Sequence, residues 1–225
     1  MLITPSLLTN SVDNLWEQIA RLTPYLPHFQ IDIVDGIFAP GTTITTGGLL
    51  TSLNKHQIEI ADNHLVFDFH LMVKDYAADL ENIREISSTI TVDTVILHFG
   101  VHPDIENLRV KYPFKFALAL NPDDTVDDLI SQYPTYQNIH GIQIMAVRPG
   151  KQGQAFMPET LNKIEQLRIA GYRNSIYLDG GINQETLPII FSQKYPPDVI
   201  GPGSFFSAAE NVEERVKFIQ DLSKE

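Results

Sequence analysis

The chain has 225 residues, of which 43% are hydrophobic, and its formal net charge is -12. This acidic excess disfavours partners that are bound through clustered Lys and Arg, so we expect neither nucleic acid nor a membrane surface as a partner. The absence of cysteine excludes disulfides and thiolate metal sites, which leaves His and carboxylate side chains as the strong metal ligands. No stretch approaches the roughly 20 apolar residues of a membrane span, and no signal-peptide pattern opens the chain, so a cytoplasmic location is expected.

Short runs rich in Val, Ile and Phe alternate with segments of helical spacing along the whole chain. This pattern is typical of repeated βα units around a parallel sheet. No linker of altered composition interrupts it, so residues 1–225 are expected to form a single domain. Eight such units in this length predict a (β/α)8 TIM barrel of the α/β class, with an open doubly wound sheet as the alternative. The strands are predicted at residues 2–7, 29–34, 65–72, 94–99, 114–120, 141–147, 175–179 and 198–201.

Four segments show an apolar face with helical spacing: residues 13–22, 123–130, 158–170 and 208–222. Pro24 should end the first helix and Gly171 the third, and the acidic start of the second suits a helix N-terminus. The residues expected to pack inward are Leu15, Ile19, Leu22, Leu161, Ile164, Leu167, Ile169, Val212, Val216, Ile219 and Leu222.

Two aspartates and a histidine occupy equivalent places near the ends of predicted strands. Asp32 and Asp179 each end an apolar run, and His70 lies on the strand that follows the one carrying Asp32. Taken singly, they could be a partner for a cation, a turn former and a core histidine. An ionised carboxylate buried there costs several kcal/mol unless it is paired or bound to metal. Together they predict acid/base chemistry at the C-terminal end of a barrel.

Glycines follow the last two predicted strands, in Asp179-Gly180-Gly181 and in Gly203-Ser204. In barrels these loops commonly bind phosphate through backbone N–H groups, although plain tight turns are the simpler alternative. The polar loop at residues 148–154 suits a lid over a phosphorylated ligand. Either Arg148 or Lys151 could approach the anion, and a solvated surface position is as plausible for both. For Asp35, Gly36 and His98 we expect supporting roles.

Several dispersed motifs follow one another along nearly the whole chain. They are Thr4-Pro5-Ser6-Leu7-Leu8, Asp32-Ile33-Val34-Asp35-Gly36, Phe69-His70-Leu71-Met72-Val73, Ala119-Leu120-Asn121-Pro122, residues 145–150, Asp179-Gly180-Gly181 and Gly203-Ser204. In type and order these motifs resemble those of the ribulose-phosphate 3-epimerase family. The resemblance implies a (β/α)8 barrel that interconverts D-ribulose 5-phosphate and D-xylulose 5-phosphate. It further implies a divalent metal (Zn, Fe, Mn or Co) and makes a homo-oligomer plausible.

The resemblance also implies roles for individual residues. Asp32 and Asp179 would bind the metal and exchange the proton through an enediolate, with His70 as a further metal ligand. Ser6 would contact the substrate, and His70, Met72 and Met145 would line its site. The phosphate-binding loops would contain Gly150, Gly153, Gly180, Gly181, Gly203 and Ser204.

The chain departs from the family pattern at two places. Gln30 stands where the family has a second metal-binding histidine, and an amide oxygen is a poorer ligand than imidazole for Zn²⁺ or Fe²⁺. Gln30 could ligate weakly, water could replace it, or the site could hold no metal. The family's Gly-Phe-Gly-Gly loop becomes Gly150-Lys151-Gln152-Gly153. Two alternatives therefore stay open: an epimerase for another sugar phosphate such as allulose 6-phosphate, and a non-catalytic sugar-phosphate-binding protein.

Overall fold

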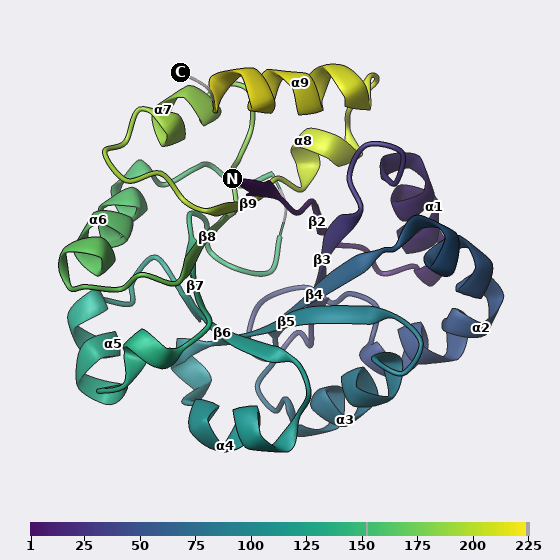
Figure 1. Ribbon diagram of the computed structural model, residues 1–225, viewed down its shortest axis with the longest axis horizontal. Helices are drawn as coiled ribbons and strands as arrows, with labels where there is room; N and C mark the ends of the chain where they lie inside the picture. The colour runs from purple at the N-terminus through teal and green to yellow at the C-terminus, as the bar shows by residue number, and fades with distance from the viewer. Residues whose placement is uncertain (152, 224–225) are drawn as a thin grey trace.

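The computed structural model describes residues 1–151 and 153–223, except for the side chains of residues 54 and 56–62. Gln152, in the predicted lid, lies outside the described residues. Parallel strands form one 9-stranded sheet in the order β1-β9-β8-β7-β6-β5-β4-β3-β2, which curls into a barrel (Figure 1). The strands are β1 (Leu2–Ile3), β2 (Ser6–Leu7), β3 (His28–Val34), β4 (Val66–Met72), β5 (Thr91–His98), β6 (Lys115–Leu120), β7 (Gly141–Met145), β8 (Ser175–Asp179) and β9 (Val199–Gly201).

A broken first strand closes the barrel. The single strand predicted at residues 2–7 is two short pieces, of which β1 pairs with β9 and β2 pairs with β3. Pro5 lies at the break because it has no N–H to give to a ladder. On one side Thr4 donates its N–H to Ile200 O at 2.9 Å, and on the other Gln30 donates to Pro5 O at 3.0 Å. The prediction of an unbroken strand was wrong here, but the predicted (β/α)8 barrel is confirmed.

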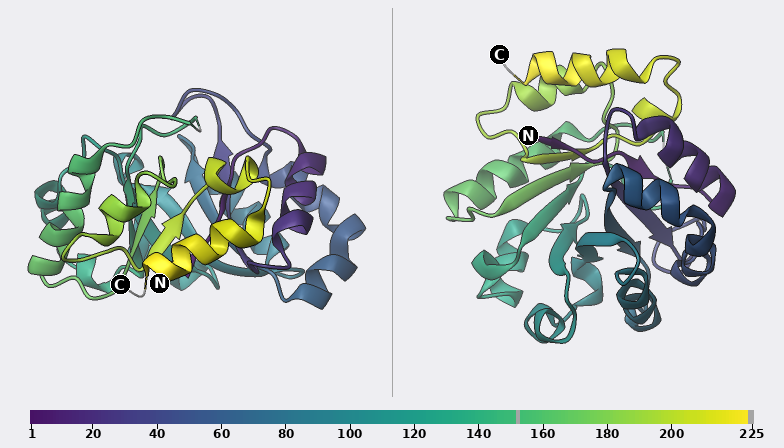
Figure 2. Two further views of the ribbon diagram at one scale, coloured as in Figure 1. Left: turned by 90° about the horizontal axis from the view of Figure 1, so that it is seen from above. Right: turned by 45° about the vertical axis from the view of Figure 1, so that its right-hand side comes forward.

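Helices form the layer outside the sheet, as both views of Figure 2 show. Among the described residues, none of these helices has the length and apolar character needed to cross a bilayer. They are α1 (Val12–Leu22), α2 (Thr46–Asn63), α3 (Ala77–Ile86), α4 (Ile105–Lys111), α5 (Val126–Gln132), α6 (Asn162–Ile169), α7 (Leu187–Phe191), α8 (Ser204–Ser207) and α9 (Val212–Leu222), with 3₁₀ turns η1 (Phe99–Val101), η2 (Tyr136–Asn138) and η3 (Pro158–Leu161).

Three predicted helix boundaries need correction. The segment expected from residue 123 begins instead at Val126, because the Thr125 side chain accepts the N–H of Asp128 and caps the helix there. The segment at residues 158–170 opens as the 3₁₀ turn η3 before it becomes α6. The segment expected from residue 208 begins instead at Val212, where the Asn211 side chain caps α9, and the short helix α8 lies before that segment.

Most of the inward positions are confirmed, and one is wrong. Leu161, Ile164 and Leu167 are buried, whereas Ile169 is 72% exposed. Ile169 follows Leu167 by two positions, and on a helix that spacing places a side chain on the opposite face. Gly171 ends α6 as predicted, with a positive φ of 89°.

Inside the barrel the side chains are mostly polar, in contrast to the apolar layer between sheet and helices. Small residues on β6 leave space for these polar side chains. They are Ala117 and Ala119, which form a compact apolar cluster with Ile96 and Met145. Near the N-terminal ends of the strands, a Cβ on Gly141 would lie 2.4 Å from the Tyr177 ring, so only glycine fits there. The buried polar side chains on β3, β4, β5, β7 and β8 are Gln30, Asp32, Asp68, His70, Thr94, His98, Gln143 and Asp179.

Candidate active site

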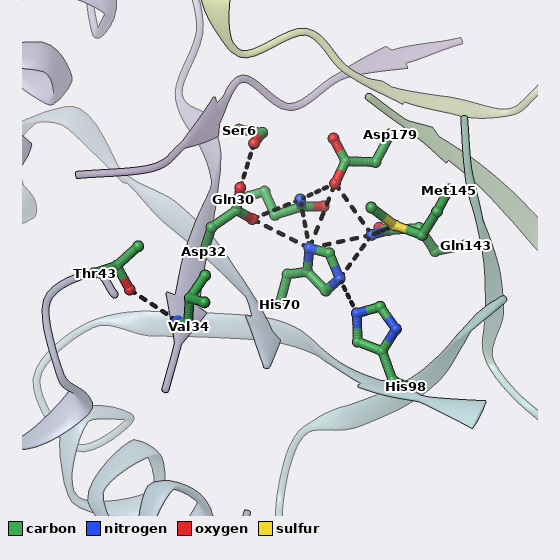
Figure 3. A network of polar contacts seen from close by, with 10 residues as sticks. All are labelled: Ser6, Gln30, Asp32, Val34, Thr43, His70, His98, Gln143, Met145 and Asp179. Atoms are coloured by element: carbon green, nitrogen blue, oxygen red, sulfur yellow. Dashed lines mark hydrogen bonds and ion pairs between the residues drawn. The ribbon is translucent and has the colours of Figure 1, made fainter. Parts of the chain in front are cut away.

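Asp32, His70 and Asp179 meet at the C-terminal end of the barrel. The register of β3 and β4 places Asp32 directly beside His70, as strand alternation predicts. His70 Nδ1 lies 3.2 Å from Asp32 Oδ1 and 3.4 Å from Asp179 Oδ2 (Figure 3). Their exposed fractions are only 3% for Asp32, 0% for His70 and 5% for Asp179. The two predicted acids and the predicted histidine therefore form one buried cluster.

Ser6 and Gln30 hold the carboxylates of this cluster in place. Ser6 Oγ donates to Asp32 Oδ2 at 2.6 Å. The Gln30 amide nitrogen lies between the two acids and donates to Asp32 Oδ1 at 3.0 Å and to Asp179 Oδ2 at 3.2 Å. Ser6 and Gln30 reach the cluster together because β2 pairs these two residues in its register with β3.

Burial and contacts within the cluster shift the pKa values of its ionisable groups. Burial alone would lower the pKa of the His70 imidazole, but hydrogen bonds and attraction to Asp179 and Asp32 outweigh it and raise the pKa to about 9. Burial raises the pKa of the Asp179 carboxyl, although its hydrogen bond with His70 opposes the rise. Burial and the charge on His70 hold the pKa of His98 well below its usual range. At neutral pH the cluster thus holds an imidazolium beside two acids and a neutral His98.

His98 fixes which ring nitrogen of His70 faces the acids. His70 Nε2 lies 2.9 Å from His98 Nε2, a separation at which one nitrogen donates and the other accepts. Because His70 is an imidazolium and His98 is neutral, His70 Nε2 donates to His98, and His70 Nδ1 is directed as a donor at Asp32 and Asp179. The two rings are also stacked, with centroids 5.0 Å apart. The supporting role expected for His98 agrees with these contacts.

Gln143 is a member of the cluster that the sequence reasoning missed. Its amide nitrogen lies 3.3 Å from both ring nitrogens of His70 and 3.4 Å from Asp179 Oδ2. The residue has no exposed surface. One sequence observation could have found it: a glutamine between Ile142 and Ile144 places an amide inside an apolar strand, where a polar group needs a partner.

A cavity of about 460 Å³, counting space open to solvent, lies above the cluster. Asp32 and Asp179 line it, whereas Gln30, His70 and Gln143 lie outside its lining. Glycines are required at its rim, because Gly180 has a φ of 99° and a Cβ there would lie 2.4 Å from Val147. The other predicted site residues that line the cavity are Ser6, Met72, Met145, Gly150, Gly153, Gly180, Gly181, Gly203 and Ser204.

Comparisons with known proteins identify the family of this barrel. Residues 2–204 match the model of the ribulose-phosphate 3-epimerase family. The chain belongs to that family. The ribulose-phosphate 3-epimerase of Encephalitozoon cuniculi is 30% identical over 224 residues, with 98% of this chain and 92% of that protein covered. The ribulose-phosphate 3-epimerase of Methanocaldococcus jannaschii is 28% identical over 229 residues, with 99% and 91% covered.

A solved structure supports the fold of this epimerase-family chain. The crystal structure of 3-hexulose-6-phosphate synthase from Salmonella typhimurium aligns with a TM-score of 0.65 at 10% sequence identity. The alignment covers 100% of this chain and 99% of that chain. At this identity the likeness concerns the barrel alone.

Contacts of Arg148 and Gln154 hold the loop after β7 in this family member. Arg148 forms a two-armed ion pair with Asp123, at 2.6 Å and 3.2 Å, so its guanidinium is directed toward the loop after β6. Both side chains are largely exposed. Gln154 donates to the carbonyls of Arg148 and Lys151. Arg148 and Lys151 both line the cavity with this loop, and an approach of either side chain to an anion stays a prediction.

Asp35 is a structural anchor, as expected. Its carboxylate accepts the backbone N–H groups of Ile37 and Phe38 at 2.7 and 2.8 Å, and that of Lys74 at 2.7 Å. Burial would raise the pKa of this carboxyl, but the backbone donors outweigh burial and lower it. Asp35 thus ties the loop after β3 to the loop after β4 beside the site.

The donor set fits a divalent metal ion. Asp32, His70 and Asp179 each present one ligand atom, and these atoms lie within 4.8 Å of one another. Two carboxylates and an imidazole are donors that metals such as Zn²⁺, Fe²⁺ and Mn²⁺ accept. Binding would release the extra proton of His70, because a ligating imidazole must be neutral.

Proposed function

We propose that this protein inverts C3 of a ketose phosphate and interconverts D-ribulose 5-phosphate and D-xylulose 5-phosphate. The observation that carries the proposal is that Asp32 and Asp179 line the same cavity from β3 and β8, with His70 in contact with both. In the ring these strands are separated by β9 and the broken first strand. Two acids placed this way suit proton removal from one face of a carbon and proton return to the other.

The two carboxyl groups would work as a pair. One ionised carboxylate accepts the C3 proton at its Oδ atom, while the other carboxyl donates a proton to the opposite face. Burial raises the pKa of Asp179, which favours the protonated form that a general acid requires. The direction of the reaction decides which of the two residues acts as the base.

The enediolate that forms between these proton transfers needs electrostatic stabilisation. A divalent ion held by Asp32, His70 and Asp179 would supply it when bound. The chain itself directs the Gln30 amide between the two acids and keeps Asp32 oriented through Ser6. These contacts hold the acids in one geometry before substrate arrives.

Phosphate recognition is assigned to the rim of the cavity. Gly180 and Gly181 follow β8, Gly203 and Ser204 follow β9, and all four line the cavity. Loops at these places are the usual phosphate site of barrels. Lys151 also lines the cavity and adds positive charge. Since α8 spans only Ser204–Ser207, backbone N–H groups carry this assignment without a contribution from a long helix.

The deciding experiment follows deuterium from solvent into C3 of ribulose 5-phosphate by NMR, in buffer supplemented with a divalent metal. The protein should incorporate deuterium and form xylulose 5-phosphate. Asp32→Asn and Asp179→Asn should each slow exchange by about 10²–10⁴-fold, the usual contribution of a general acid or base. Rapid exchange in either variant would contradict the two-acid mechanism.

The contacts of Gln30 favour one alternative function, which is binding without catalysis. Its amide satisfies both carboxylates without any metal, which would suit a non-catalytic sugar-phosphate-binding protein. Saturable binding of ribulose 5-phosphate with no exchange and no xylulose product would support that alternative. The homo-oligomer and the cytoplasmic location stay predictions.

A further inference from the structure

Two glutamine amides converge on the acid cluster from β3 and β7. The Gln30 nitrogen lies 3.0 Å from Asp32 Oδ1, 3.2 Å from Asp179 Oδ2 and 3.4 Å from His70 Nδ1. The Gln143 nitrogen lies 3.4 Å from the same Asp179 oxygen and 3.3 Å from the same His70 nitrogen. Each amide therefore touches the atoms that would ligate a metal.

Gln143 lacks a full-strength partner in this arrangement. Its contacts with His70 and Asp179 are 3.3 Å or longer, beyond ordinary hydrogen-bond distances, and its remaining contact is with the weakly accepting sulfur of Met145. Its carbonyl oxygen is buried and has no hydrogen-bond partner among the described residues. A buried amide that is left this way costs free energy, so the Gln143 side chain would gain stability from a further polar partner.

An amide can exchange its oxygen and nitrogen by a half turn with almost no change in shape. With nitrogen inward, both glutamines donate to the acids, which suits the cluster without metal. With oxygen inward, both offer neutral oxygen donors beside Asp32, Asp179 and His70. Ligand atoms around one small divalent ion lie about 3 Å apart at right angles, and the Gln30 contacts are of this size.

We infer that Gln30 and Gln143 supply amide oxygens to a divalent ion at this site and shift its preference toward hard ions such as Mn²⁺ and Mg²⁺. With both amides turned inward, the donors are four oxygen groups and one imidazole. Carboxylate and carbonyl donors suit Mn²⁺ and Mg²⁺, whereas imidazole favours Zn²⁺. The inference deepens the proposed function and rests on it only for the ion's role in the reaction, since binding is measured without substrate.

The test titrates metal-free protein with Mn²⁺, followed by the spectrum of free Mn²⁺ and by calorimetry, and then with Zn²⁺ in competition. The parent should bind one Mn²⁺. Gln143→Met keeps the length of the side chain and removes the amide, and it should weaken Mn²⁺ binding about 10 to 100-fold. Gln30→His should raise the ratio of Zn²⁺ to Mn²⁺ affinity at least about tenfold. Gln18→Met is the matched control, because Gln18 lies partly exposed on α1 and bonds to Asn14 rather than to the acid cluster, and it should change neither value.

Three outcomes would overturn the inference: no Mn²⁺ binding by the parent, unchanged Mn²⁺ affinity in folded Gln143→Met, or an unchanged affinity ratio in Gln30→His. Circular dichroism checks that each variant is folded. If Gln143→Met does not fold, Gln143→Glu keeps an oxygen at the same position and must bind Mn²⁺ at least as tightly as the parent. The C3 exchange assay is separate, so a failed epimerase proposal and a failed metal preference give different results.

Discussion

Each end of the barrel carries a histidine beside a buried aspartate. At the N-terminal end, His28 Nε2 of β3 lies 3.0 Å from Asp68 Oδ2 of β4. The backbone N–H of Thr94 donates to the other oxygen of Asp68 at 3.0 Å. At the C-terminal end, one imidazole serves both Asp32 and Asp179, and these acids open onto a cavity. In the second arrangement two acids share one imidazole.

Burial raises the pKa of the carboxyl at both ends, for Asp68 as well as for Asp179. A perturbed carboxyl is therefore insufficient to identify a site in this molecule. Asp68 is matched by His28 and Thr94, whereas Asp179 shares its histidine with a second acid. Two acids that share one imidazole and line a cavity mark the chemical end of the barrel, whereas an acid with its own histidine marks the structural end.

The largest effect is expected from a substitution that removes one member of the His28–Asp68 pair. Asp68→Ala removes the partner of His28 and leaves the Thr94 N–H unpaired, so the free energy of unfolding should fall by about 3–5 kcal/mol. Urea denaturation measures this loss. The C3 exchange rate of the variant, taken at a temperature where it is folded, should stay within about threefold of the parent rate. A folded variant without exchange would assign Asp68 to the chemistry.

A smaller effect on stability is expected from the charge on His70 at the C-terminal end of the barrel. Because His70 has its pKa raised from 6.5 to about 9, its contribution to stability is complete below pH 6.5 and is lost as the pH rises through about 9. Metal-free protein should thus lose up to about 3 kcal/mol across this interval. Unfolding measured against pH checks it, with His70→Asn as the control that should show a flatter profile. Equal slopes for the two proteins would refute the charged state of His70.

The smallest effect comes from the exposed pair of Arg148 and Asp123. Both side chains are more than half exposed, at 64% and 69%, and such pairs contribute little to stability. Arg148→Ala should leave the melting temperature unchanged within error. It should also change KM for a phosphorylated substrate by less than about threefold, since the guanidinium is directed to Asp123. A tenfold rise in KM would instead assign Arg148 to the phosphate.

The sequence predicted the centre of the site because strand alternation and strand order decide it. Asp32 and His70 share a register position on neighbouring strands, and the placement of Asp179 opposite them follows from barrel closure. The contacts of Gln143 with His70 depend on side chains that cross the barrel, and no local pattern encodes them. Likewise, the ion pair of Arg148 with Asp123 joins two loops whose conformations depend on packing.

Two predictions about the fold were wrong because hydrophobicity and backbone geometry indicated different structures. A run of apolar residues predicts one strand at residues 2–7, but Pro5 interrupts the ladder. The apolar character of Ile169 suggested burial, although its helical spacing from Leu167 places it on the solvent side. In both cases backbone geometry outweighed hydrophobicity.

The joint at Pro5 also limits when the protein can become active during its synthesis. Thr4 bonds to Ile200, across a separation of 196 positions, and Ser6 holds Asp32 only a few bonds away from that joint. Since the ring is closed by its first and last strands, a ribosome must release β9 before the acids are locked together. A nascent chain that lacks β9 therefore carries Asp32 and His70 without a closed ring, and activity should begin only after β9 has emerged.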